Sequence, residues 1–405
     1  MNQKKNIILL HPTGNSNVRA LVEGVEQSGL LQNFYTCIAV FKNTAFYKFT
    51  GFGPFKQFRK RMFSSKLKPY TKVRPGKELK RLLFQNLGIK THFDVDNIYW
   101  DLDFHVSGKL KNSNAVYAFE DGALSTFEQA KKRNMTCYYD LPIGYWRSMH
   151  QILEKERENN PDWAQSLQHF KDSEEKLMRK DQELSLADQI FVASTFTAKT
   201  LEQFPGKLAP IKIIPYGFPK VIAERKYPEN FQLPLKVLFV GGLSQRKGIS
   251  YLFEAAEILG KQIKLTLVGK KPNEDCTILN KELNRHNWIP SLPHPEILKL
   301  MRQHDVLVFP SLFEGFGMVI TEAMSQGTPV ITTNRTCGQD IIRHGENGWL
   351  IEAGSTQALI SQLQEIIKNP SIIEKNGRGS IYTASQRPWK KYGKEMADAL
   401  CLNIQ

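Results

Sequence analysis

Short apolar runs alternate with helix-like segments in two successive series, and this alternation limits the fold more than any other feature of the 405-residue chain. The strand-like runs of the first series are residues 7–10, 35–41, 115–119, 135–140, 189–193 and 211–215. Those of the second are residues 236–240, 264–268, 306–309, 330–333 and 349–351. Strands that alternate with helices favour a parallel sheet covered on both faces. The sequence therefore predicts an α/β protein with two Rossmann-like, doubly wound domains in tandem.

A segment with several prolines and no clear period, residues 216–234, separates the two series. We place the first domain at residues 1–217 and the second at residues 218–387. An amphipathic segment follows, in which one helical face contains Trp389, Tyr392, Met396 and Leu400. Doubly wound domains bind ligands at the carboxyl ends of their strands. We therefore expect the ligand in a cleft between the two domains.

The composition indicates a globular protein without a membrane span. Hydrophobic residues make up 41% of the chain and aromatic residues 11%. No apolar run approaches the roughly 20 residues that cross a bilayer, and the run at residues 7–10 is too short for the core of a signal peptide. The five cysteines are scattered, without metal-ligand spacing or a disulfide framework. We therefore expect a reducing, cytoplasmic location.

The segment Glu314-Gly-Phe-Gly-Met-Val-Ile-Thr-Glu322 places two carboxylates around the expected start of a helix. A buried strand, residues 306–309, is expected before it, and glycines lie in the turn. A strand, a glycine-bearing turn and a helix N-terminus form a common binding site for phosphate. The two acidic side chains suit a ligand that carries many hydroxyl groups beside its phosphates. The sequence therefore predicts a nucleotide-sugar site in the second domain.

Further motifs follow one another in a specific order through the second domain. They are Val240-Gly-Gly-Leu-Ser-Gln-Arg-Lys-Gly248, Leu267-Val-Gly269, residues 305–309, Pro310-Ser311, residues 314–322, Gly327-Thr-Pro-Val330 and Gly345-Glu-Asn-Gly348. In this order and spacing the second domain resembles the retaining glycosyltransferases of family 4, within the glycosyl transferases group 1. The first domain resembles that family only loosely.

The resemblance implies a GT-B fold, with the donor bound by the second domain and the acceptor by the first. It also implies that the final helix, residues 388–405, packs back on the first domain. The donor would be a UDP- or GDP-linked sugar that gives a hexose-type sugar to a glycan, glycolipid or lipid-linked acceptor. The family needs no metal ion, and Asp101-Leu-Asp103 has the letters of a metal motif without its context. We therefore expect no metal and no cofactor.

Two cations after residues 236–240 are candidates for stabilising the leaving diphosphate. Arg246 and Lys247 follow the strand and its turn, where their side chains can reach the cleft. Fixed cations and aimed amides stabilise charge that develops in a transition state. Members of family 4 often have an arginine where this chain has Gly242, and Arg246 can substitute for it. A pair of solvated turn cations is the alternative.

The resemblance implies roles for the residues of segment 314–322. Backbone amides at the helix start are expected to contact the diphosphate and the sugar, from Gly315, Phe316, Gly317, Met318 and Val319. Glu322 is expected to bind the ribose hydroxyls, and Glu314 is expected to face the transferred sugar. The alternative for Glu314 is an acid that only complements the helix dipole.

The first domain offers weaker candidates. Gly14 lies in the first strand-to-helix turn, where the backbone can touch the donor phosphates or the acceptor. Glu120 and Asp121 follow a strand and can position the acceptor or face the anomeric carbon, and a turn capped by Asp121 is an equal alternative. We find no equivalent of the family's first-domain histidine, and we expect His294 and His304 to be surface residues. Two mechanisms that retain the anomeric configuration stay open. In one the leaving phosphate acts as the base, and the other is a covalent double displacement.

Basic residues are concentrated in one insert, residues 41–90. The insert contains fourteen lysines and arginines against one acid, Glu78, whereas the remainder of the chain contains 41 against 39. Ten aromatic residues lie among these cations. Cations mixed with apolar side chains suit an anionic membrane surface, so the insert indicates a peripheral membrane position or an anionic acceptor. A solvated surface is the alternative, and we expect no nucleic acid.

The sequence as a whole indicates a metal-independent, retaining glycosyltransferase of polysaccharide or glycolipid synthesis. Two alternatives stay open. A nucleotide-sugar epimerase of the same fold would convert the donor without an acceptor, and a non-catalytic protein would use residues 41–90 to bind membrane or nucleic acid.

Overall fold

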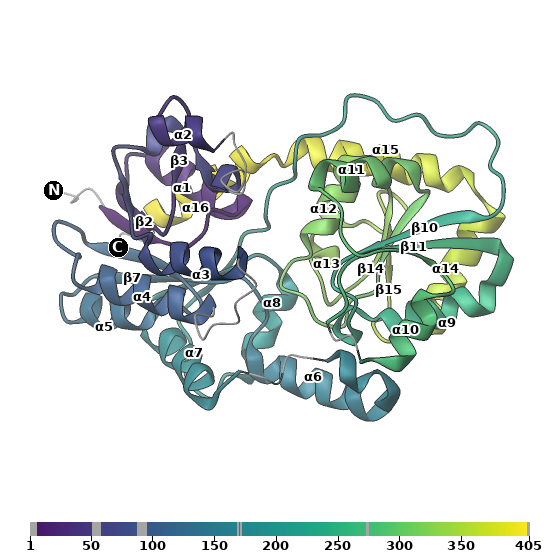
Figure 1. Cartoon of the computed structure of the whole chain (residues 1–405), viewed down its shortest axis with the longest axis horizontal. Coiled ribbons are helices and arrows are strands. Elements are labelled where there is room, and N and C mark those ends of the chain that lie inside the picture. The colour runs from purple at the N-terminus through teal and green to yellow at the C-terminus, as the bar shows by residue number, and fades with distance from the viewer. Residues whose placement is uncertain are drawn as a thin grey trace.

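Two parallel β-sheets, each flanked by helices, make up most of the structure (Figure 1). The computed structural model describes residues 6–50, 58–86, 95–167, 170, 172–272 and 275–402. No helix in this described part of the chain is both long and apolar enough to cross a bilayer. The α/β architecture predicted from the alternation of apolar runs is confirmed. We call the elements around the first sheet the first unit and those around the second sheet the second unit.

The first sheet contains seven parallel strands in the order β5-β2-β1-β6-β7-β8-β9. The strands are β1 (Ile7–Leu10), β2 (Leu31–Thr36), β5 (Thr71–Val73), β6 (Ala115–Phe119), β7 (Thr136–Leu141), β8 (Gln189–Val192) and β9 (Ile211–Ile213). The inner strand β1 is buried along its whole length, in agreement with its uninterrupted apolar sequence. In its register with β6, Leu9 lies opposite Tyr117. Since all seven strands are parallel, their carboxyl ends meet at one edge.

One predicted strand, residues 35–41, is wrong in its bounds because the chain turns within this run. Strand β2 ends at Thr36, whose hydroxyl donates to the carbonyl oxygen of Pro12 at 3.2 Å. A separate strand, β3 (Val40–Phe41), pairs with β4 (Met62–Phe63) of the basic insert. Both strands are largely buried, so the sequence stays apolar through the turn and does not mark it.

The second sheet contains six parallel strands in the order β12-β11-β10-β13-β14-β15. They are β10 (Leu235–Val240), β11 (Ile263–Val268), β12 (Asn287–Ile289), β13 (Val306–Phe309), β14 (Val330–Thr333) and β15 (Trp349–Ile351). Strand β12 lies at the edge, is partly exposed and was not predicted. The other five strands agree closely with the apolar runs of the sequence, because a strand buried on both faces is apolar throughout.

Helices flank both sheets and are numbered in the order of the chain. In the first unit they are α1 (Ser16–Gln27), α2 (Ala45–Phe49), α3 (Gly76–Asn86), α4 (Val95–Ser107), α5 (Leu124–Lys131), α6 (Trp146–Asn159), α7 (Glu174–Leu186) and α8 (Thr195–Thr200). In the second unit they are α9 (Ile249–Leu259), α10 (Thr277–Leu283), α11 (His294–Gln303), α12 (Met318–Ser325), α13 (Gly338–Ile341), α14 (Thr356–Lys368) and α15 (Ser371–Gln386).

The final helix, α16 (Trp389–Leu402), returns from the second unit to the first and packs against α1 (Figure 1). Its apolar face is buried and includes Tyr392, Met396 and Leu400. This is the face that the amphipathic pattern of the sequence indicates. The chain therefore crosses between the two units twice, once before β10 and once after α15.

Side chains also join the two units directly. Trp163, which follows α6, stacks on Phe253 of α9 with ring centroids 5.7 Å apart. The carboxylate of Glu156 accepts from the hydroxyl of Tyr251 at 2.9 Å and from the side-chain amide of Gln245 at 2.6 Å. In Figure 1, α6 accordingly lies beneath the second sheet. These contacts hold the two units in one arrangement.

Candidate active site

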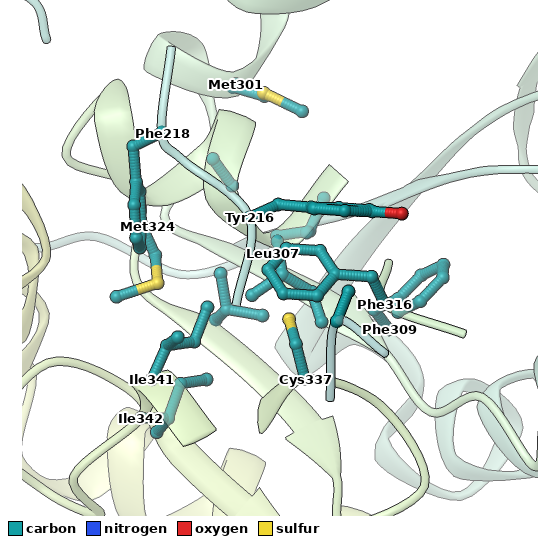
Figure 2. Close-up of a cluster of buried hydrophobic side chains, with 14 of the residues drawn as sticks. Tyr216, Phe218, Met301, Leu307, Phe309, Phe316, Met324, Cys337, Ile341 and Ile342 are labelled. Carbon is teal, nitrogen blue, oxygen red and sulfur yellow. The ribbon is translucent and has the colours of Figure 1, made fainter. Parts of the chain in front are cut away.

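A cleft of about 1000 Å³ lies between the two units, where the carboxyl ends of β1 and β10 face it. One wall consists of the turn from β1 to α1 and part of the basic insert, and the other consists of the turn after β10 and the segment from Glu314 to Glu322. Aromatic side chains also line the cleft. Tyr216 packs on Phe316 with ring centroids 4.8 Å apart, and Phe309 lies nearby in the same buried cluster (Figure 2). This is the position in which doubly wound domains bind ligands.

Most residues predicted to bind the donor line this cleft. They are Gly14, Gly242, Arg246, Lys247, Phe316, Gly317, Met318, Val319 and Glu322, together with the catalytic candidate Glu314. Apart from Gly14, they all belong to the second unit. Arg246 and Glu314 are 68 positions apart in the chain, and the fold brings them onto the same wall.

Arg246 and Lys247 lie in a short 3₁₀ turn after β10 and face the acidic segment. Nη1 of Arg246 donates to the carbonyl oxygen of Phe313 at 2.7 Å, while its Nε is buried and has no hydrogen-bond partner among the described residues. The ammonium group of Lys247 pairs with the carboxylate of Glu314 and lies 4.9 Å from the ring centroid of Phe309. Both cations are therefore fixed at the cleft wall.

Burial makes these two cations sensitive to a bound anion. It lowers the pKa of Arg246 to about 10. It also lowers the pKa of Lys247 well below its usual value, and the neighbouring charge of Arg246 lowers it further. A negative group placed beside them would stabilise their charged forms. Because arginine offers a forked donor and lysine a compact charge, the pair can receive the two phosphates of a diphosphate.

The N-terminus of α12 opens onto the same wall. Its N-cap is Gly317, whose φ of 89° is a left-handed conformation that glycine adopts without strain. No side chain of the described residues caps this end, so backbone amides of the first turn stay available. A helix N-terminus carries a partial positive charge and binds anions. The helix end thus adds to the charge of Arg246 and Lys247.

Gly315, which was also predicted to contact the donor, is not among the residues that line the cleft. A Cβ at Gly315 would overlap the carbonyl oxygen of Pro142 in the first unit, so only glycine permits this approach. The carbonyl oxygen of Gly315 accepts from Ser194 Oγ at 2.6 Å and from Thr197 Oγ1 at 2.9 Å. The first unit therefore holds the loop between Glu314 and α12 in place.

Two histidines expected at the surface have defined partners. His294, the first residue of α11, is exposed, but its Nε2 lies 3.0 Å from Oε1 of Glu322. Burial raises the pKa of Glu322, and His294 acts in the opposite direction. His304 is buried rather than exposed, and its Nδ1 lies 2.8 Å from the carbonyl oxygen of Leu300. The contact with Glu322 forms between two helices, so no local pattern of the sequence indicates it.

Glu120 and Asp121 are not among the residues that line the cleft. Nζ of Lys180 on α7 lies 3.3 Å from Glu120 and 3.6 Å from Asp121, and the backbone amide of Asp121 donates to Glu183 at 2.9 Å. Burial raises the pKa of Glu120 to about 7, against the opposing effect of Lys180. These contacts hold the turn after β6 against α7, and Glu183 rather than Asp121 accepts the backbone amides of this turn.

The aspartates of Asp101-Leu-Asp103 also have protein partners. Asp101 accepts from Nε of Arg74 at 2.6 Å. Asp103 is fully buried and accepts the backbone amides of Ser125 and Thr126, each at 2.8 Å. In the described part of the chain, no three histidine, cysteine, aspartate or glutamate side chains are grouped as metal ligands.

Three further cations line the wall of the first unit and were not singled out in the sequence. They are Arg19 of α1 and Lys60 and Arg61 of the basic insert. In the sequence, only the excess of positive charge in residues 41–90 pointed to the two cations of the insert, and it did not indicate which of the insert's cations face the cleft. Residues 51–57 and 87–90 of that insert lie outside the described residues.

Solved structures with the same architecture identify the fold. Sucrose-phosphate synthase from Thermosynechococcus elongatus gives a TM-score of 0.65 at 18% identity, over 98% of this chain and 98% of that one. Anabaena HepE in complex with UDP-glucose gives a TM-score of 0.62 at 18% identity, over 98% of this chain and 99% of that one. Two doubly wound units with a cleft between them define the GT-B fold, and this prediction is confirmed.

Similarity in sequence is concentrated in the second unit. The family model for glycosyl transferases group 1 matches residues 222–394. The capsular polysaccharide biosynthesis glycosyltransferase CapM of Staphylococcus aureus is 28% identical over 185 residues, which cover 42% of this chain and 47% of CapM. The chain thus spans about half the length of this curated relative. The range matched by the family contains Arg246, Lys247, Glu314 and Glu322, and therefore the second-unit wall of the cleft.

Proposed function

We propose that the protein is a retaining, metal-independent glycosyltransferase that moves a hexose-type sugar from a UDP- or GDP-linked donor to a glycan, glycolipid or lipid-linked acceptor. The observation that carries this proposal is the convergence of Arg246, Lys247 and the N-terminus of α12 on one cleft wall. The similarity to glycosyl transferases group 1 over the same residues supports it. HepE, which has the same fold, binds UDP-glucose.

In the proposed reaction, the bond between the anomeric carbon and the diphosphate breaks while the acceptor hydroxyl bonds to that carbon. Negative charge grows on the departing diphosphate, and Arg246, Lys247 and the first-turn amides of α12 stabilise it. Glu322 accepts hydrogen bonds from the ribose hydroxyls, and Glu314 accepts them from the transferred sugar. Because side chains and amides supply the positive charge, the proposal includes no metal ion.

We further propose that the leaving diphosphate takes the proton of the acceptor hydroxyl. Glu314 and Glu322 are the acids that line the cleft among the described residues, and both belong to the wall assigned to the donor. Glu314 is paired with Lys247, and Glu322 is paired with His294. A covalent double displacement needs a nucleophile on the other face of the sugar. The described residues of the first-unit wall include no carboxylate for that role.

A panel of nucleotide sugars tests the proposed function. The protein is incubated with UDP- and GDP-linked hexoses in the presence of EDTA, and nucleotide release and sugar products are followed by NMR. We expect slow release of nucleotide with at least one donor, since water can replace the acceptor, and retention of the anomeric configuration in the sugar. Isomerised nucleotide sugar would favour the epimerase of the same fold. Neither binding nor turnover of any donor would favour the non-catalytic protein.

A further inference from the structure

We infer that the first-unit end of the cleft binds a phosphate group carried by the acceptor. The inference rests on the proposed function and narrows its acceptor to a phosphorylated molecule. Arg19, Lys60 and Arg61 line this end of the cleft. Among the described residues of the same wall there is no aspartate or glutamate. This end therefore presents positive charge that the donor-binding wall does not use.

The charge of the whole cleft exceeds what one donor requires. Its lining cations are Arg19, Lys60, Arg61, Arg246 and Lys247, and its lining acids are Glu314 and Glu322. A nucleotide sugar carries about two negative charges on its diphosphate, one for each phosphate. The proposed donor contacts place that diphosphate at the second-unit wall. The three cations of the first-unit wall are then available for a second anion.

Acids behind the first-unit wall offset its charge only in part. Glu78 is buried and lies 2.6 Å from Arg61, but it also binds a second arginine of the insert, at 2.9 Å. Arg19 on α1 is attracted by the charge of Glu23 and repelled by the charge of Arg61. Lys60 is exposed and forms no ion pair within the described part of the chain. A net positive charge therefore stays at the cleft.

Arg19 also fixes the position of the insert. Its Nη2 donates to the backbone carbonyl of Lys60 at 2.6 Å, and its guanidinium carbon lies 6.0 Å from the ring centroid of Phe63. Its Nε is buried and has no hydrogen-bond partner among the described residues. A buried donor of this kind is costly unless another group accepts from it. The cations of α1 and of the insert are thus held together before any substrate arrives.

The N-terminus of α1 contributes to the same end of the cleft. Residues 14–17 line it, and the N-cap Asn15 makes no capping bond with its side chain to any described residue. The helix is 12 residues long, and the amides of its first turn attract an anion. A phosphate there could accept hydrogen bonds from these amides, from an arginine fork and from a lysine. The hydroxyl groups of a neutral glycan would leave the cations without a counter-charge.

Calorimetry with inorganic pyrophosphate as the probe tests the inference on protein saturated with UDP or GDP. We expect pyrophosphate to bind while the nucleotide occupies the donor wall. Lys60→Gln and Arg19→Gln should each weaken this binding by about tenfold, the effect of one lost bond to a charged group. Lys68→Gln is the matched control, because Lys68 is an exposed cation of the same insert that does not line the cleft.

The outcomes separate this inference from the proposed function. Failure of every nucleotide to bind would count against both. Nucleotide binding without a second site for pyrophosphate, or an equal loss in Lys68→Gln and Lys60→Gln, would overturn the inference alone.

The rate of donor turnover, measured with different acceptors added, then identifies the kind of molecule that carries the acceptor phosphate. Acceleration by sugar phosphates, but not by neutral sugars, would support a soluble acceptor. Acceleration by vesicles that contain a polyprenyl phosphate, but not by vesicles of phosphatidylglycerol, would support a lipid-linked one. Equal acceleration of donor turnover by both kinds of vesicle would contradict the inference and assign the cations to a membrane surface. Acceleration of donor turnover by neutral glycans, to the same extent in Lys60→Gln as in the wild type, would also contradict it.

Discussion

Glu314 and Lys247 form an ion pair, which joins the acid that we propose faces the sugar to a cation that we propose binds the diphosphate. In the structure, Glu314 supplies the counter-charge of a largely buried lysine. A donor diphosphate would compete for that lysine and release the carboxylate toward the hydroxyls of the sugar. The pair thus links occupation of the phosphate site to the availability of Glu314.

We expect Glu314→Ala to lower donor turnover by at least about 100-fold, the scale of a lost transition-state contact. The sugar loses its acceptor of hydrogen bonds, and Lys247 loses its partner in a partly buried setting. Steady-state rates and melting curves should be measured beside Glu352→Ala, which removes an exposed acid of the same unit. A wild-type rate in Glu314→Ala would remove this residue from the proposed mechanism.

Binding of the nucleotide sugar should depend on pH in two directions. Burial raises the pKa of Glu322, so its charged form is lost as the pH falls through that raised pKa. Burial lowers the pKa of Lys247, so its charged form is lost as the pH rises through that lowered pKa. Since both charged forms make the proposed contacts, affinity should pass through a maximum between the two pKa values.

Titration calorimetry across the pH range measures this profile. Glu322→Gln should weaken binding at the maximum and flatten the acid side, because the amide does not titrate. A profile whose acid side is unchanged in Glu322→Gln would contradict the role of Glu322.

At the element scale, the loop from Glu314 to α12 owes its position to elements of the first unit. Ser194 and Thr197, at the start of α8, donate to the carbonyl oxygen of Gly315, and Pro142 after β7 packs behind it. The amides of α12 therefore face the cleft through contacts formed across the two units.

Gly315→Ala should disturb this support. The added methyl group would overlap the carbonyl oxygen of Pro142, and an overpacked contact costs about 1–3 kcal/mol. We expect a lower melting temperature and slower nucleotide release in the donor panel. Gly76→Ala, where no described atom lies within 4 Å of the added Cβ, is the control. Equal behaviour of the two variants would show that the contact does not support the loop.

Local sequence signals predicted the elements of the site better than its contacts. Strand β13 and the start of α12 were predicted because a buried apolar run and glycines mark them. Gly315 and Gly317 are two glycines of the same turn in the sequence. In the structure Gly315 touches the first unit, whereas Gly317 is the N-cap of α12. Glu120 and Asp121 also follow a strand as acids, but Lys180 engages them. Partners from distant segments decide such differences, and no local pattern contains them.

At the scale of the whole molecule, the cleft depends on several connections between the units. Besides the contacts of Gly315, they include the segment with Tyr216, which lines the cleft, the contacts of α6 with the second unit, and the return of α16 to α1. The alternation of strands and helices was sufficient to predict the two sheets. The basic insert was visible as a charge excess, but only the folded chain brings Lys60 and Arg61 beside Arg19.

The central proposal is that the second-unit wall binds the diphosphate of a nucleotide sugar, and calorimetric titration of UDP and GDP in the presence of EDTA tests this directly. At least one of the two should bind the wild-type protein without a divalent cation. Lys247→Gln should weaken that binding by about tenfold or more, whereas Lys261→Gln, an exposed cation away from the cleft, should not. Absence of binding by both nucleotides, or wild-type affinity in Lys247→Gln, would contradict the proposal.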